Sequence, residues 1–144
     1  MPTELRGRKR TDAAWATPKR CLLAVLVMFI SMVAIGSIPG NADALSAMVY
    51  DKVLHTVAYG LLSVLLFFGI SGSQRMRALC SIGAIAALGA LDEGIQSMLP
   101  YRHANFHDWK FNMLGAIASV GLLSSWYSLR MRASRKPGSS KPGT

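Results

Sequence analysis

The chain has 144 residues, of which 51% are apolar, and its 16 Lys and Arg outnumber seven Asp and Glu to give a net charge of +9. The mean hydropathy of +0.32 and the concentration of cations near the two chain ends exclude an ordinary soluble domain and are typical of a membrane protein. The length allows one domain. Two cysteines, Cys21 and Cys80, are too few for a disulfide scaffold, and we interpret them as packing residues.

The first 20 residues are basic and contain few large apolar side chains. Such a composition cannot bury enough surface to fold alone, so we expect residues 1–20 to be a disordered cytoplasmic tail. A nucleic-acid-binding arm is the alternative, but no interleaved aromatic residues or nucleic-acid-binding fold accompany the cations. Six cations directly before an apolar segment are typical of an orientation signal and of contact with anionic lipids. We therefore expect membrane lipids, and no nucleic acid, as partners.

An uncharged apolar run at residues 21–38 predicts a first membrane helix, which a Pro-Gly pair at 39–40 ends. A cleaved secretory signal is the alternative, because residues 42–44 read Ala-Asp-Ala and resemble a cleavage site. The apolar run exceeds the roughly 7 to 15 residues usual for a signal peptide, which favours the membrane helix.

A second membrane helix is predicted for residues 53–72, where the only ionisable side chains are His55 and Tyr59. Together with Asp51 they fall at positions i, i+4 and i+8, so they share one face of the helix. This spacing predicts a polar stripe that faces other helices.

A third membrane helix is predicted for residues 78–99, after a turn-rich basic connection, and Pro100 stops it. Near its end, Asp92, Glu93 and Gln96 can share one broad face. Three small residues on this helix have a spacing that permits close helix approach: Ala86, Ala90 and Gly94.

A fourth helix is predicted to begin near Asp108, with Asn112 one turn deeper, and to continue uncharged from residue 111 to residue 129. Gly115 and Ser119 again have the spacing that permits close approach. Residues 131–144 repeat Lys, Arg, Pro, Gly and Ser, so we expect a second disordered basic tail.

The distribution of cations predicts the topology. The N-terminal segment, the connection before the third helix and the C-terminal segment hold six, two and five Lys and Arg, whereas the other connections hold only Lys52, Arg102 and Lys110. The positive-inside rule then places both termini in the cytoplasm and brings three sets of polar residues together in the outer leaflet. We predict an all-α integral membrane four-helix bundle at residues 21–130, with short loops and disordered basic termini.

The polar residues resemble those of the VanZ-like membrane proteins in three motifs over roughly residues 21–130: Asp51-Lys52-x-x-His55-x-x-x-Tyr59, Asp92-Glu93-x-x-Gln96-x-x-x-Pro100-x-Arg102 and Asp108-x-x-x-Asn112-x-x-Gly115. Tyr101 departs from the glycine that is often found between that proline and arginine. The family takes its name from a protein associated with resistance to the antibiotic teicoplanin. The resemblance implies a bacterial-type envelope protein of the cytoplasmic membrane, and it does not supply a reaction.

Ionised groups are costly in a membrane, at about 2.5 to 3.5 kcal/mol each near the bilayer centre, so these residues are candidates for function. One hypothesis is a site that binds or acts on an amphiphile, such as a membrane lipid or a lipid-linked envelope precursor. The candidate acid-base residues are Glu93, Asp92 and His55. The candidate ligand-binding residues are Asp51, Lys52, Tyr59, Gln96, Arg102, Asp108 and Asn112.

The second hypothesis is structural. The same residues would form a closed hydrogen-bond network that fixes the bundle, because unpaired polar groups there would be costly, and the protein would act through envelope-assembly partners. Both hypotheses use the same residue types, so the sequence leaves open whether the protein is an enzyme, and it leaves the oligomeric state unknown.

A metal site is a third interpretation, since His103 and His107 have i, i+4 spacing. However, Ala104 stands where the H-E-x-x-H motif has its glutamate, and we expect no metal. The sequence also contains no Ser-His-Asp order, glycine-rich phosphate loop or redox Cys pair, so we expect no cofactor.

Overall fold

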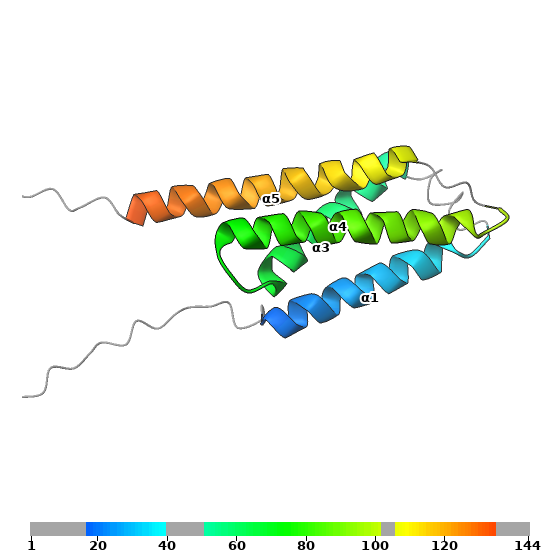
Figure 1. The fold of residues 1–144 in the computed structure, drawn as a ribbon, viewed down its shortest axis with the longest axis horizontal. Coiled ribbons are helices and arrows are strands. Elements are labelled where there is room, and N and C mark those ends of the chain that lie inside the picture. Colours follow the sequence, from blue (N-terminus) through cyan, green and yellow to red (C-terminus); the bar gives the residue numbers. More distant parts are fainter. Residues whose placement is uncertain (1–16, 40–50, 102–105, 135–144) are drawn as a thin grey trace, which may run out of the picture.

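The computed structural model describes residues 17–39, 51–101 and 106–134. These residues form helices that run side by side (Figure 1): α1 (Pro18–Gly36), α3 (Asp51–Gly69), α4 (Gln74–Ser97) and α5 (Phe106–Ser134). The predicted all-α bundle is confirmed. The end of α4 and the beginnings of α3 and α5 lie at one end, which we call the polar end. The beginnings of α1 and α4 and the end of α5 lie at the opposite, basic end.

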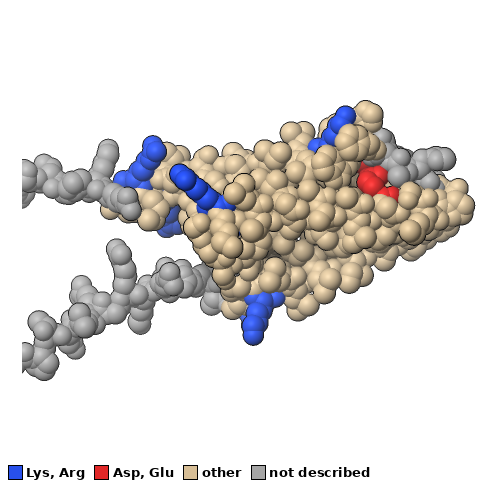
Figure 2. Space-filling model, viewed as in Figure 1, with Lys and Arg blue, Asp and Glu red and all other residues tan. Residues whose placement is uncertain are grey.

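Three of the described helices, α1, α3 and α4, are long and apolar enough to cross a membrane. Their outward surfaces carry exposed leucine, isoleucine and valine side chains, which suits contact with lipid. In Figure 2 the visible Lys and Arg gather mainly at the basic end, Asp and Glu lie near the polar end, and the surface between them is largely uncharged.

Helix α5 has 29 residues and extends about 44 Å at the helical rise. Unlike α1, α3 and α4, it is not apolar enough to count as a candidate membrane span. Its serines, glycines and Asn112 lower its mean hydropathy. That α5 crosses the membrane remains a prediction.

Helix α3 is the centre of the bundle, because it packs against α1, α4 and α5. It contributes Tyr59, Leu62 and Leu66 to the core, where they meet Ile85 of α4 and Ala116 of α5. Lipid tails are as apolar as these side chains, so close packing and cross-helix hydrogen bonds, more than hydrophobic burial, hold such a bundle together.

The closest helix approach joins α3 and α5. A Cβ at Gly115 would overlap the carbonyl oxygen of Thr56, and a Cβ at Gly60 would lie 2.9 Å from the Ser119 hydroxyl oxygen. The glycine and serine spacing predicted for close approach on the fourth helix therefore lies at this contact. On α4 the close contact is made by Gly89, whereas a Cβ at Gly94 would meet nothing within 4 Å.

Helix α4 begins at Gln74, four residues earlier than predicted, because two side chains stabilise its first turn. The Ser73 hydroxyl accepts a hydrogen bond from the Met76 backbone N–H at 3.3 Å, as an N-cap does. The Arg77 Nε donates to the Phe67 carbonyl at 2.6 Å, and its guanidinium lies 4.3 Å from the centre of the Phe67 ring. Arg77 therefore ties the beginning of α4 to the end of α3, where a cation also suits the helix dipole.

Helix α5 extends through Ser134 and so includes residues that we predicted to belong to the disordered tail. Arg130 lies 5.1 Å over the Trp126 ring, one turn earlier, and a cation near a helix C-terminus is favourable. Residues 1–16 and 135–144, which hold most of the two predicted tails, lie outside the described part of the chain.

Candidate functional site

The predicted polar residues of the helices lie at the polar end of the bundle. Several have buried side chains: Tyr59, Asp92, Gln96, Asp108 and Asn112. Others are partly exposed: Lys52, His55 and Glu93. Asp51 begins α3, but its side chain lies outside the described part of the chain, as do Arg102 and His103.

Asp92 faces α3 and accepts a hydrogen bond from Tyr59. The Tyr59 hydroxyl lies 3.0 Å from Asp92 Oδ2, and both side chains are buried. A hydroxyl donor satisfies one oxygen of a carboxyl group that would be costly to bury alone. The bond joins the middle of α3 to the end of α4.

His55 and Asn112 form a second cross-helix pair, between α3 and α5. His55 Nδ1 lies 3.0 Å from Asn112 Oδ1, and the His55 ring stacks on Tyr59 with 6.2 Å between ring centres. The two pairs are therefore continuous across three helices, and we call His55, Tyr59, Asp92 and Asn112 the polar cluster.

The orientation of the Asn112 amide determines the tautomer of His55. With Oδ1 facing the imidazole, His55 Nδ1 must carry the proton, whereas a reversed amide would donate to an unprotonated Nδ1. Asn112 is fully buried, and its Nδ2 has no hydrogen-bond partner among the described residues. Exchanging the two amide ends therefore breaks no other hydrogen bond of Asn112 among the described residues.

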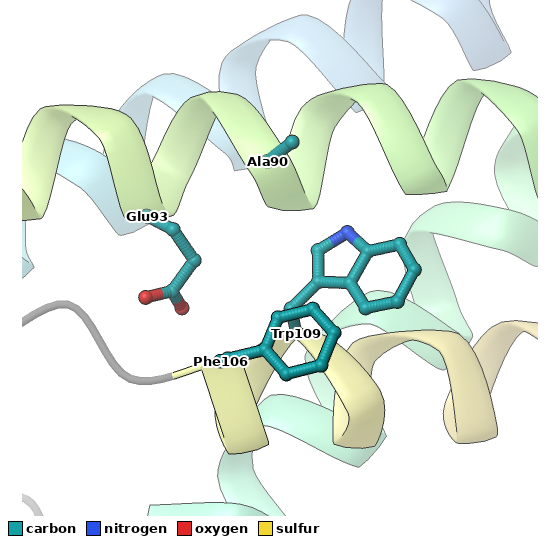
Figure 3. A pocket seen from close by; sticks show the side chains of 4 residues that line it. All are labelled: Ala90, Glu93, Phe106 and Trp109. Atoms are coloured by element: carbon teal, nitrogen blue, oxygen red, sulfur yellow. The ribbon is translucent and has the colours of Figure 1, made fainter.

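An open pocket lies beside the polar cluster, between α4 and α5. Its volume is about 520 Å³, and it is lined by Ala90 and Glu93 of α4 and by Phe106 and Trp109 of α5. Figure 3 shows the Glu93 carboxylate and the Trp109 ring in the space between these helices, with the Phe106 ring next to Trp109 at the beginning of α5. The lining is mainly apolar, and Glu93 supplies the charged group among the described residues that form it.

Trp109 lines this pocket and is held by contacts with both helices. Its indole Nε1 donates to the Ala86 carbonyl at 3.1 Å, and its ring stacks on Phe106 with 5.4 Å between ring centres. Gly89 makes room for it, because a Cβ there would lie 3.1 Å from Trp109 Cδ1 and 3.2 Å from Asn112 Nδ2.

The two lysines of the polar end lie over aromatic rings. Lys52 Nζ is 5.4 Å from the centre of the Phe111 ring, and Lys110 Nζ is 5.1 Å from the centre of the Phe106 ring. Neither lysine lines the pocket. Lys52, predicted as a ligand-binding residue, is placed at the edge of the site.

Sequence reasoning did not select the pocket residues Phe106 and Trp109, nor Gly89. A signal for Trp109 was present, because tryptophan is enriched at the membrane–water interface and this one follows Asp108 directly. Phe106 was assigned to the connection because the helix was expected to begin two residues later. The small-residue spacing on α4 selected Gly94, whereas the structure places Gly89 at the close contact.

The fold and the polar site define an all-α protein with membrane-spanning helices and polar groups at one end of the bundle. The chain belongs to the VanZ/LLP1 family, whose profile matches residues 9–127. A relative is an uncharacterized protein of the fission yeast Schizosaccharomyces pombe, which is 30% identical over 112 residues that cover 77% of this chain and 69% of the relative. No solved structure matches the chain. The predicted VanZ-like membership is confirmed.

Proposed function

We propose that this VanZ-type membrane protein binds an amphiphile at the pocket between α4 and α5. The observation that carries the proposal is an open, mainly apolar pocket whose charged lining group, Glu93, lies beside the polar cluster. Apolar lining fits the chain of an amphiphile, and the few polar groups at the end of the bundle would fix its head group. Glu93 is about 6 Å before the end of α4 at Ser97, by the helical rise, which is a suitable depth for a head group.

The location supports an amphiphile of the outer leaflet. The cation distribution favours cytoplasmic termini, which would place the polar end at the outer surface of a bacterial cytoplasmic membrane. We propose a lipid or lipid-linked envelope precursor as the amphiphile, and an altered susceptibility to teicoplanin-type antibiotics as a consequence of its capture. Since a relative occurs in fission yeast, binding of a membrane amphiphile is a more general expectation for the family than antibiotic resistance.

If the protein also acts on the amphiphile, Glu93 is the residue best placed to exchange a proton with it. Asp92 accepts a hydrogen bond from Tyr59, and His55 is hydrogen-bonded to Asn112. Glu93 instead lines the open pocket. Asp92 and His55 would then position the helices and not touch the ligand. This assignment narrows the three predicted acid-base residues to one.

A non-catalytic scaffold is the second candidate function, and the polar cluster favours it. Its two cross-helix hydrogen bonds connect α3 to α4 and α3 to α5, as a network that only fixes the bundle would. Such a protein would act through envelope-assembly partners and would need no ligand in the pocket.

Ala90→Phe tests the amphiphile proposal, because a phenyl group at this pocket-lining position would fill space that the ligand needs. We expect this variant to retain several-fold less lipid than the wild type after extraction in a mild detergent, with lipids identified and counted by mass spectrometry. Ala87→Phe is the matched control, since Ala87 is exposed on the same helix but does not line the pocket. Equal lipid retention by the wild type and both variants would leave the scaffold as the better explanation.

A further inference from the structure

The basic end of the bundle carries cations without acidic residues in the described part of the chain. All described Asp and Glu belong to the polar end: Asp51, Asp92, Glu93 and Asp108. The chain ends add little negative charge, since residues 1–16 hold four Lys and Arg against two acidic residues, and residues 135–144 hold three against none. An anion from outside the chain would therefore be attracted to this end.

Two cations of the basic end, Arg77 of α4 and Arg130 of α5, lie over aromatic rings. The Arg77 guanidinium is 4.3 Å from the centre of the Phe67 ring, and the Arg130 guanidinium is 5.1 Å from the centre of the Trp126 ring. Tyr127 connects the two rings, because its ring centre lies 6.1 Å from that of Phe67 and 5.2 Å from that of Trp126. We call these five residues the arginine–aromatic cluster. It joins the end of α3 and the last part of α5 to the beginning of α4.

The ring contacts leave hydrogen-bond donors of both arginines available. An aromatic ring stacks on the face of a guanidinium, whereas the N–H groups lie in its plane, where two of them can pair with two oxygens of a phosphate. The Arg77 Nε–H is donated to the Phe67 carbonyl at 2.6 Å, and the terminal N–H groups of Arg77 have no partner among the described residues. Arg77 is half-buried and so held in place, which lowers the entropic cost of binding an anion.

Helix packing sets the relative position of the two arginines. In the first turn of α4, Gln74 Nε2 donates to the Ser124 carbonyl of α5 at 2.8 Å. Arg77 ties the same turn to the end of α3. The beginning of α4 is therefore fixed to both neighbouring helices, and the cluster does not need to assemble around a ligand.

The surroundings of the cluster suit a phospholipid. Helices α3 and α4, whose adjoining ends supply Phe67 and Arg77, are both long and apolar enough to cross a membrane, so the turn between them lies at the membrane surface. Trp126 is 51% exposed and Leu129 is 65% exposed, which gives apolar surface beside the arginines. Basic pockets between membrane helices bind the head groups of anionic lipids. Cations next to exposed apolar side chains fit a lipid better than a free phosphate ion.

We propose that the arginine–aromatic cluster binds the phosphate of an anionic phospholipid in the leaflet at the basic end, through Arg77 and Arg130. The cluster lies at the opposite end of the bundle from the pocket between α4 and α5, so the proposal does not depend on the function proposed above. A general attraction between cations and an anionic membrane would involve all exposed cations of this end alike. A difference between matched cations therefore separates a lipid site from that attraction.

The test compares lipid retention from bilayers of stated composition. The full-length protein is reconstituted in nanodiscs that contain equal amounts of phosphatidylglycerol and phosphatidylethanolamine with the same acyl chains. It is then extracted in mild detergent, and the retained lipids are counted by mass spectrometry. We expect the wild type to retain the anionic glycerol lipid preferentially, by about fivefold for each arginine, which is the contribution of one cation near an anionic lipid surface.

Arg130→Gln should lower this preference about fivefold. Arg132→Gln is the matched control, because Arg132 is also exposed on the last turns of α5 and its loss changes the net charge equally, but it does not belong to the cluster. It should leave the preference close to the wild-type value. Arg77→Lys keeps the charge but loses the two-pronged geometry of the guanidinium, so it should also lower the preference.

Each other outcome overturns the proposal. A wild-type protein that retains the two lipids equally would have no anionic-lipid site. Equal losses in Arg130→Gln and Arg132→Gln would show a general attraction to the membrane, whether or not Arg77→Lys folds. If excess inorganic phosphate abolished the preference while chloride at the same ionic strength did not, the cluster would be a site for free phosphate and not for a lipid.

Discussion

Asp92 and Glu93 are adjacent in the sequence but have different surroundings, because successive residues of a helix are rotated by about 100°. Asp92 turns toward α3 and meets the Tyr59 hydroxyl. Glu93 turns toward the beginning of α5 and lines the pocket. One carboxyl group therefore contributes to the joint between helices, while its neighbour faces the space proposed for a ligand.

The Tyr59–Asp92 hydrogen bond should be measurable as a coupling between two substitutions. Tyr59→Phe removes the donor and Asp92→Ala removes the acceptor, so either substitution alone abolishes the hydrogen bond. We expect the double variant to be less destabilised than the sum of the single variants by about 0.5 to 2 kcal/mol, the range for hydrogen bonds between membrane helices. Equilibrium unfolding in one fixed detergent measures these free energies.

The control for this coupling pairs Tyr59→Phe with Ser31→Ala. Ser31 is exposed on α1, and its hydroxyl donates to the Val27 carbonyl within the same helix. These two substitutions share no partner and should be additive. If Tyr59→Phe and Asp92→Ala were additive as well, the two side chains would not form a bond that stabilises the bundle.

At the scale of the helices, the position of α5 depends on the crossing at Gly115. A side chain there would collide with the backbone of Thr56, which cannot move without displacing α3. We expect Gly115→Ala to destabilise the protein by about 1 to 3 kcal/mol or more through this overpacking. The measurement is the free energy of unfolding in detergent.

Two other glycines provide matched controls for this crossing. A Cβ at Gly121, on the same helix, would meet nothing within 4 Å, so Gly121→Ala should be neutral or stabilising, as expected from helix propensity. Gly60→Ala would press on the Ser119 side chain, which can rotate, and should cost less than Gly115→Ala. A different order of the three variants would mean that α3 and α5 do not cross here.

The sequence predicted the helices because their apolar runs are long and are separated by turn residues and charges. It misplaced the beginning of α4 because Ser73 and Arg77 were assigned to a loop, and the cap and the contact with Phe67 depend on where the preceding helix ends. The continuation of α5 through Ser134 was not predicted, because a cationic sequence such as that around Arg130 is compatible with either a disordered tail or the end of a helix.

The convergence of the polar motifs was predictable, whereas their pairing was not. The alternation of helix directions was enough to predict that residues such as His55, Asp92 and Asn112 lie at one end. Which of them meet depends on the rotation of each helix about its axis, which small residues such as Gly89 and Gly115 determine through packing. The pocket depends on the same rotations.

At the scale of the whole molecule, charge is segregated along the bundle. The described cations of the basic end lie on the first turns of α1 and α4 and the last turns of α5: Lys19, Arg20, Arg75, Arg77, Arg130 and Arg132. The polar end combines the carboxyl groups with two lysines that lie over aromatic rings. This asymmetry is visible in Figure 2 and gives the predicted orientation a physical basis, because Lys and Arg that flank membrane helices tend to stay in the cytoplasm.

The last prediction concerns this orientation and, with it, whether α5 crosses the membrane. In a variant without Cys21 and Cys80, single cysteines are introduced at residues 10, 44, 71, 104 and 136. A membrane-impermeant maleimide applied to intact cells should label positions 44 and 104, whereas positions 10, 71 and 136 should react only after lysis, with total reactivity in lysed cells as the control. Labelling of 104 and 136 on the same side would show that α5, the helix of lower hydropathy, does not span the membrane.

Inversion of all five positions would place the polar end in the cytoplasm and remove the outer leaflet as the source of the amphiphile. A mature chain that begins at Leu45 would instead show that the first helix is a cleaved signal.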